Sequence, residues 1–148
     1  MDALDFPPFD YRVRKINGRA RIFDRCRGRY VALTPEEWVR QHLVHFLADH
    51  LGYPWQLVSV EQEIEVHGLR RRFDVVCHDR RGRPYLIVEC KAPDAPLSPA
   101  TFEQAFGYNR SVAARHVAIT NGRVHLRGEI AGDALRVLPG FPPYAGDE

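Results

Sequence analysis

Residues 72–91 read RFDVVCHDRRGRPYLIVECK, and the fold that we expect follows from this stretch. Two apolar runs flank a segment at 80–84 whose glycine and proline are typical of a turn. The runs are therefore predicted to fold back on each other as an antiparallel hairpin. If the turn centres on Arg81 and Gly82, Asp74 lies directly opposite Glu89.

Three side chains of this hairpin form a candidate site. Glu89 and Lys91 point to one face of their strand, because side chains alternate along a strand with a period of two. Opposed residues of a hairpin also share a face, which adds Asp74. Lys91 is one of only two lysines in a chain whose other basic residues are arginines. A lysine in this position therefore calls for a chemical explanation.

A cation is the expected partner of the two acids, because adjacent carboxylates repel each other. Mg²⁺ is typically held by one or two carboxylates and by waters, so we expect Asp74 and Glu89 to bind Mg²⁺, with Mn²⁺ as a substitute. Lys91 would then orient or activate a metal-bound water. The alternative is an ordinary surface ion pair, which contributes little to stability. Against it, Glu89 follows the apolar run 85–88, where an unpaired acid is costly.

The order of an Asp, a hairpin and Glu-x-Lys resembles the PD-(D/E)xK nuclease superfamily. The segment LIVECKAP at 86–93 is similar to the N-terminal nuclease domain of the restriction (R) subunit of type I restriction enzymes. Phe73 stands where the motif has proline, a position that varies in such families. The resemblance covers about residues 34–125, and its other segments are TPEEWVRQ at 34–41, GYP at 52–54 and VAITNG at 117–122.

This resemblance implies an α/β, restriction-endonuclease-like fold with a central mixed sheet flanked by two helices. The implied activity is Mg²⁺-dependent hydrolysis of DNA phosphodiester bonds, with the backbone carbonyl of Cys90 as a further metal ligand. An acid on the first helix would also reach the metal site. We expect Glu36 to face the core and to be this acid, with Glu37 as the weaker candidate. The alternative for Glu36 is a first-turn acid that is favoured by the helix dipole and paired with Arg40.

A second helix carries Gln104 and Tyr108, which match a Gln-x-x-x-Tyr element of some PD-(D/E)xK nucleases. In those nucleases the element lies near the catalytic centre and the DNA strand. The alternative is a solvent-facing glutamine and a half-buried tyrosine.

Arginines are the expected contacts to DNA phosphates, because the planar guanidinium donates two parallel hydrogen bonds. They cluster before the hairpin, at its tip and in the N-terminal region, where they alternate along the chain at positions 12, 14, 19 and 21. Taken singly, each could equally be a solvated charge. Those that we expect to contact nucleic acid are Arg70, Arg71, Arg72 and Arg81.

The chain divides into three parts by its pattern. We expect an N-terminal β-hairpin extension at 1–33, with Asn17-Gly18 as a hairpin turn, a nuclease-like domain at 34–138 and a flexible tail at 139–148. In the domain we expect helices at 34–50 and 99–114, and strands near 57–66, 73–79, 84–92, 117–121 and 124–127.

The composition of the chain bears on which ligands and which location are expected. The formal net charge of the 148 residues is only +2, so nucleic-acid binding would have to come from local patches. The three cysteines show no paired spacing, and the histidines of the first helix, including His42, are predicted to form a solvated face and not a zinc site. With neither a membrane-length apolar run nor a start typical of a signal peptide, the expected location is the cytoplasm.

The chain has no phosphate-binding glycine loop, which excludes an ATP-driven motor within it. The expected partners are DNA and a separate helicase, translocase or specificity subunit. Two alternatives to a nuclease stay open: a non-cutting nucleic-acid-binding module that acts with such subunits, or a structural protein in which the triad is an internal ion pair. The sequence leaves open DNA against RNA, the target sequence and whether the chain forms a dimer.

Overall fold

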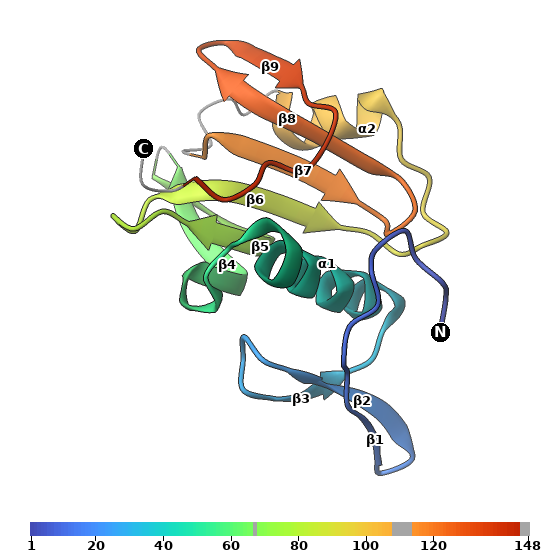
Figure 1. Cartoon of the computed structure of the whole chain (residues 1–148). Helices are drawn as coiled ribbons and strands as arrows, with labels where there is room; N and C mark the ends of the chain where they lie inside the picture. The colour runs from blue at the N-terminus through green and yellow to red at the C-terminus, as the bar shows by residue number, and fades with distance from the viewer. Residues whose placement is uncertain (67, 108–113, 146–148) are drawn as a thin grey trace.

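The computed structural model describes residues 1–66, 68–107 and 114–145, which form two sheets and two helices (Figure 1). The elements in chain order are β1 (Val13–Ile16), β2 (Arg19–Asp24), β3 (Arg29–Ala32), α1 (Pro35–Leu51), a 3-10 turn (Trp55–Leu57), β4 (Val58–Val66), β5 (Leu69–His78), β6 (Pro84–Cys90), α2 (Pro99–Phe102, continued by a π-helical turn at Glu103–Gly107), β7 (His116–Thr120), β8 (His125–Ala131) and β9 (Ala134–Val137).

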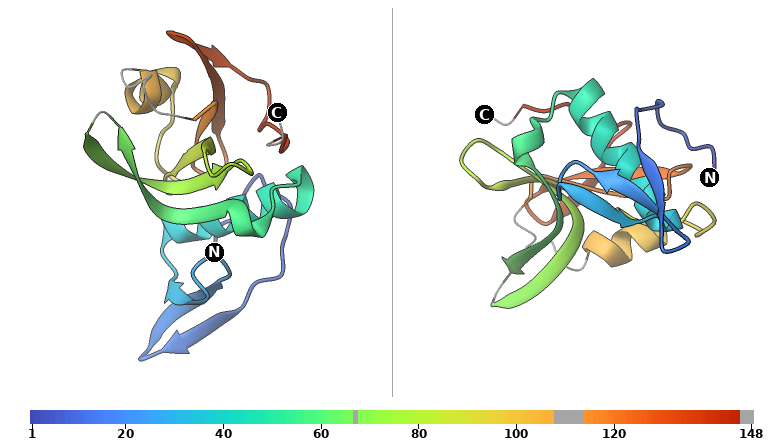
Figure 2. Two further views of the ribbon diagram at one scale, coloured as in Figure 1. Left: turned by 90° about the vertical axis from the view of Figure 1, so that its left-hand side faces the viewer. Right: turned by 90° about the horizontal axis from the view of Figure 1, so that it is seen from below.

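The larger sheet is mixed and has six strands in the order β4-β5-β6-β7-β8-β9. Only β6 and β7 pair in parallel, and the other neighbours are antiparallel. One helix covers each face, as Figure 2 shows. A mixed α/β architecture with a central mixed sheet and two flanking helices was predicted from the sequence and is confirmed.

The β5–β6 hairpin has the predicted register. Val75 pairs with Val88 and Val76 with Ile87, so the same register aligns Asp74 with Glu89. A register shift at Cys77/His78 accommodates a turn that is longer than two residues.

Helix α1 begins and ends where the sequence predicts. The Thr34 side chain accepts a hydrogen bond from the Glu37 N–H at the N-cap, and Gly52 ends the helix with a φ of 80°. Between the caps, an apolar stripe packs on the face of the sheet that carries Val75, Leu86 and Val88. The buried residues of this stripe are Val39, Leu43, Val44 and Leu47.

The opposite face of the sheet is covered by α2. Ser98 and Thr101 form a capping box at its start. Phe102 and Phe106 then pack against Phe73, Val76, Ile87 and Ile119. The predicted second helix is seen from residue 99 to residue 107, and the part at 108–113 lies outside the described residues.

The N-terminal extension is a separate three-stranded sheet in the order β1-β2-β3. Its first turn is the predicted one, because Asn17 and Gly18 both have positive φ (52° and 75°), as a tight hairpin turn requires. Ile22 and Val31 pack against Trp38 of α1, so α1 lies between the two sheets (Figure 2).

Two predictions about the surface differ from the structure. His42 is buried and not solvated, because the N-terminal segment crosses α1. The imidazole ring of His42 packs against Phe9 of this segment and against Trp38. Residues 139–145 were predicted to be a loose tail, yet they pack on the core. Tyr53 Oη donates a 2.7 Å hydrogen bond to the carbonyl of Pro142, and Tyr144 lies against the Tyr53 ring.

The three cysteines are free thiols, and Cys77 and Cys90 are buried as predicted. None of the helices in the described part of the chain is long and apolar enough to cross a membrane.

Candidate active site

Asp74 and Glu89 contact each other where β5 and β6 separate. Beyond the Val75–Val88 pair, the Asp74 N–H donates to Glu89 Oε1 at 3.2 Å, and the Cys90 N–H donates to Asp74 Oδ2 at 2.8 Å. Each carboxylate thus takes the place of a backbone acceptor that the diverging strands no longer supply. The sequence register explains why the two acids meet, and their half-buried position explains why their charges interact.

The pKa of Glu89 is raised to about 7. Burial is the main cause, since it disfavours the ionised form, and the negative charge of Asp74 is the second. The hydrogen bond from the Asp74 backbone and the charges of Arg71 and Lys91 act in the opposite direction but do not outweigh them. Burial and the charge of Asp74 thus both disfavour the ionised form of Glu89, and a bound cation would favour it.

Glu89 and Lys91 both line a cavity of about 220 Å³ on the α2 side of the sheet. The shared face of Glu89 and Lys91 was predicted from the period of two. Asp74 was predicted to share it, but Asp74 does not line this cavity and approaches Arg40 on the α1 side. Gln104 of the π-helical turn lines the same cavity, as the Gln-x-x-x-Tyr comparison led us to expect. Tyr108, the other half of that pair, lies outside the described residues.

Arg71 is the arginine that reaches this cavity. Its Nη2 donates to the carbonyl of Ala105 at 3.2 Å, and its guanidinium lies 4.6 Å from the centre of the Phe73 ring. These two contacts hold a positive charge beside Glu89, where it is available to an anion.

The other predicted nucleic-acid contacts do not meet at the acid pair. Arg70 is exposed and pairs with Glu63 at 3.4 Å, and Arg72 is exposed. Arg81 lies in the β5–β6 turn, seven residues along the chain from Asp74, a span of roughly 20 Å for a strand. Arg81 is at the tip of the hairpin, as the sequence predicts, and its contact to nucleic acid, which would lie away from the acid pair, stays a prediction.

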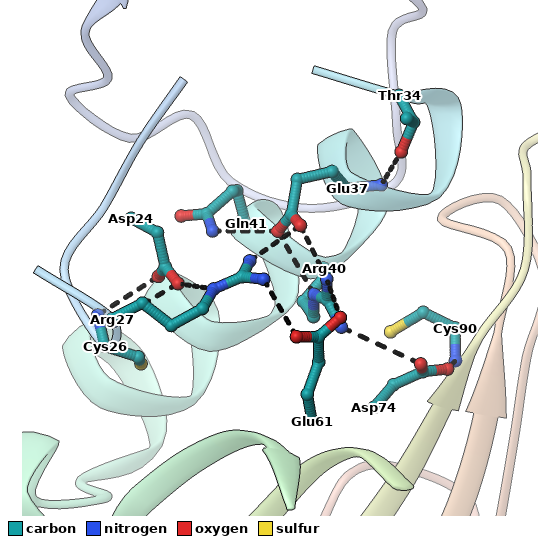
Figure 3. Close-up of polar contacts among 10 residues, drawn as sticks. All are labelled: Asp24, Cys26, Arg27, Thr34, Glu37, Arg40, Gln41, Glu61, Asp74 and Cys90. Atoms are coloured by element: carbon teal, nitrogen blue, oxygen red, sulfur yellow. Dashed lines mark hydrogen bonds and ion pairs between the residues drawn. The ribbon is translucent and has the colours of Figure 1, made fainter. Parts of the chain in front are cut away.

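On the α1 side, Asp74 faces an arginine. Its Oδ1 lies 3.7 Å from Arg40 Nη1 (Figure 3). Arg40 is fixed by Glu37, whose carboxylate accepts hydrogen bonds from Arg40 Nη2 at 2.5 Å and from Nε at 3.1 Å. The same carboxylate accepts hydrogen bonds from Arg27 Nη2 at 2.7 Å and from Gln41 Nε2 at 3.0 Å.

The prediction that Glu36, and not Glu37, faces the core is wrong. Glu36 is exposed, whereas Glu37 is only 4% exposed. Burial by itself would raise the pKa of Glu37, but the hydrogen bonds from Arg40, Arg27 and Gln41 lower it to about 2. The physical reason is that α1 is covered on two sides, and the turn after β2 encloses a helix face that a single sheet would leave in solvent.

Sequence reasoning also missed Glu61. It lies on β4 across from Asp74, has a φ of 54°, and its carboxylate approaches Arg27 at 3.4 Å and Arg40 at 3.8 Å. Backbone strain of this kind gathers at functional sites. The sequence does not indicate a positive φ at a non-glycine residue of a strand. The signal that the sequence did offer was an acid within the residues of β4.

The donor set suits a hard divalent ion. Two carboxylates on adjacent strand ends, one with a raised pKa, match the way in which Mg²⁺ is held together with waters. Across residues 1–66, 68–107 and 114–145, no group of three or more His, Cys, Asp or Glu side chains is placed to hold a metal ion.

Comparisons with known proteins agree with the fold. The family model described as type I restriction enzyme R protein N terminus (HSDR_N) matches residues 35–141. A solved fragment structure assigned to an HsdR subunit of a type I restriction enzyme from Vibrio vulnificus YJ016 has a similar fold, with a TM-score of 0.52 and 18% sequence identity. The similarity covers 74% of this chain and 24% of the other, so the chain spans about a quarter of that fragment. No curated protein matches the chain.

Proposed function

Because the chain belongs to the family of type I restriction enzyme R protein N termini, we propose that it is a Mg²⁺-dependent nuclease of the PD-(D/E)xK type that hydrolyses phosphodiester bonds in DNA. The observation that carries the proposal is the contact between Asp74 and Glu89, with Lys91 on the face of Glu89.

Asp74 and Glu89 are the residues that would hold the metal ion, and the carbonyl of Cys90 is proposed as a further ligand. When bound, Mg²⁺ lowers the pKa of a water and neutralises charge on a phosphate. Each acid must be ionised to bind it. The raised pKa of Glu89 therefore makes the affinity for the ion depend on pH near neutrality.

Lys91 is proposed as the group that orients the attacking water and offsets the negative charge that develops on the phosphate. Its ammonium is exposed on the cavity that Glu89 and Gln104 also line, so it is accessible to a phosphate. Arg71, held at the same cavity, is proposed to bind a non-bridging phosphate oxygen.

Arg40 is proposed as a positioning residue. Glu37 fixes its guanidinium, and Arg40 then places a positive charge 3.7 Å from the Asp74 carboxylate. This charge attracts the Asp74 carboxylate from the α1 side, opposite the cavity that would receive the substrate.

The chain is proposed to act with other subunits. It contains no phosphate-binding loop of its own, and the chain of the similar fragment structure is longer. A separate motor or specificity protein would bring DNA to the site.

Lys91→Ala tests the proposal. Plasmid, linear and single-stranded DNA are incubated with the purified chain in Mg²⁺ or Mn²⁺, with EDTA as the control. The loss of a positioned catalytic group should slow cleavage by on the order of 10²-fold or more. Lys15→Ala removes the same charge from the exposed strand β1 and should cut like the parent. Equal cleavage by the parent and Lys91→Ala would show that Lys91 has no catalytic role.

A second candidate is a nucleic-acid-binding module that does not cut. Arg40 favours it, because a guanidinium beside Asp74 supplies part of the charge that a metal ion would otherwise supply. In the same assay this module would bind DNA and leave every substrate intact in both metals.

A further inference from the structure

The N-terminal sheet carries a concentration of positive charge. Residues 11–33 contain eight Arg or Lys and a single Asp, in a chain whose formal net charge is only +2. The remainder of the chain is therefore net acidic. The strands β1, β2 and β3 of this region precede residues 35–141, which the family model matches, so the family assignment gives this sheet no role.

Four of these arginines share one face of the sheet, which we call the arginine face: Arg12, Arg14, Arg19 and Arg21, together with Phe23 and Tyr30. Arg14 lies opposite Arg21, and Phe23 lies opposite Tyr30. Because opposed residues share a face, and so do alternate residues of one strand, these side chains project together. The other face carries Ile22 and Val31, which are buried against α1.

The arginine face is ordered by its aromatic rings. The guanidinium of Arg12 lies 5.0 Å from the centre of the Phe23 ring, and that of Arg14 lies 4.7 Å from the centre of the Tyr30 ring. Such contacts hold the charged groups in place without neutralising them.

The charges on this face are also uncompensated. No carboxylate of the described residues lies within ion-pair distance of Arg12, Arg14, Arg19 or Arg21. In contrast, Arg27, on the turn after β2, pairs with Asp24, Glu37 and Glu61. Arg27 is therefore paired inside the protein, whereas the four arginines of the arginine face are available to an external anion.

We propose that the arginine face binds the phosphate backbone of nucleic acid and anchors duplex DNA next to the candidate active site. Repeated same-sign charge with interleaved aromatic rings is suited to a nucleic-acid backbone, where guanidinium groups contact phosphates and aromatic rings contact sugars or bases. Arg27 at the second turn of the sheet contacts Glu37 and Glu61. Both acids contact Arg40, which lies beside Asp74, so a chain of ion pairs connects the sheet to the site. The inference rests on the proposed function for its choice of DNA.

One end of the face is less suited to phosphate than the other. Arg12 and Phe23 border a hollow of about 510 Å³ that Asp10 and Asp49 also line. These acids would repel a phosphate. The contact is therefore expected along Arg14, Arg19 and Arg21.

A binding experiment tests the proposal without cleavage. Fluorescence anisotropy of a labelled random-sequence duplex of about 25 base pairs is measured with the full chain in EDTA, over a series of salt concentrations. The face variant is Arg14→Gln with Arg19→Gln, both exposed positions. The matched control is Lys15→Ala with Arg29→Gln. The control removes the same charge from exposed residues that are neighbours in the strand of arginine-face residues and therefore project away from that face.

Each lost phosphate contact should lower the slope of log affinity against log salt by about 0.9, and affinity at ~0.1 M salt should fall by on the order of tenfold or more for the face variant. The control should bind like the parent, and Arg14→Lys with Arg19→Lys should keep most of the binding. Equal losses in face and control variants would overturn the proposal in favour of a net-charge effect. An unchanged face variant would also overturn it, as would a parent that does not bind the duplex.

This experiment separates the inference from the proposed function. A chain that cuts DNA but binds it equally with and without Arg14 and Arg19 contradicts the arginine face alone. A chain that loses binding in the face variant yet never cuts DNA contradicts the nuclease proposal alone.

Discussion

The charge of Glu89 is sensitive to pH near neutrality. Its pKa is raised from an ordinary value of 4.5 to about 7, so the folded protein holds this proton more tightly than the unfolded chain between these values. The stabilisation that this protonated side chain contributes is therefore complete below its ordinary pKa of 4.5. In the absence of a divalent ion, the contribution of Glu89 to the free energy of unfolding should decrease as the pH rises through this window.

Glu89→Gln should remove this part of the pH dependence, because the amide does not titrate. The measurement is thermal unfolding of parent and variant in EDTA at about pH 5 and about pH 8. The parent should lose more stability than the variant between the two conditions. The same loss in both proteins would show that another group titrates here.

Glu37 and Glu36 are neighbours with opposite environments. Glu37→Gln should destabilise the protein by about 3 kcal/mol, because it leaves Arg27 and Arg40 without their buried counter-charge. Glu36→Gln changes an exposed side chain and should alter stability by less than about 0.5 kcal/mol. Urea unfolding of both variants checks the difference. A larger effect at Glu36 would restore the orientation that was predicted from the sequence.

This pair also shows why residue environments are harder to predict than residue types. The helical period placed Glu36 on the stripe of Val39 and Leu43, on the assumption that α1 buries one face. Two sheets cover α1, and the second sheet encloses Glu37. Glu37 is held in this buried position by a hydrogen bond from Arg27, which lies on the turn after β2. No local sequence pattern of α1 encodes this contact.

Among the elements, those with strong local signals were predicted from the sequence. The caps of α1, the Asn17-Gly18 turn and the β5–β6 register all follow from a few residues each. Strand β9 was not predicted, because its four mostly exposed residues are too short a segment for the alternation of Leu135, Arg136 and Val137 to stand out. The packing of residues 139–145 was also missed, because their prolines predict a loop but not what the loop contacts.

The separation of β5 from β6 has the most direct consequence for the site. Phe73 packs on the α2 face and Val75 on the α1 face, so the alternation of side chains breaks at Asp74. Glu61 lies across from this break with a positive φ. The sequence predicted that Asp74 and Glu89 would meet, and only the structure shows that Asp74 lies between Glu89 and Arg40.

At the scale of the whole molecule, two sheets meet at α1, and the candidate site lies near their junction. The internal charges of Glu37, Arg27 and Arg40 connect the N-terminal sheet to Asp74. This connection predicts that the extension and the site act together, one by binding a phosphate backbone and the other by hydrolysing it. The sequence indicated the acids and the arginines separately but not that a single network joins them.

The central claim is that Asp74 and Glu89 together hold a divalent cation. Its most direct test is a calorimetric titration of Mg²⁺, and of Mn²⁺ in parallel, into the parent, Asp74→Asn and Lys91→Ala at about pH 8, above the raised pKa of Glu89. We expect saturable binding to the parent and to Lys91→Ala, and its loss in Asp74→Asn. A parent that binds neither metal, or an Asp74→Asn variant that binds as tightly as the parent, would contradict it.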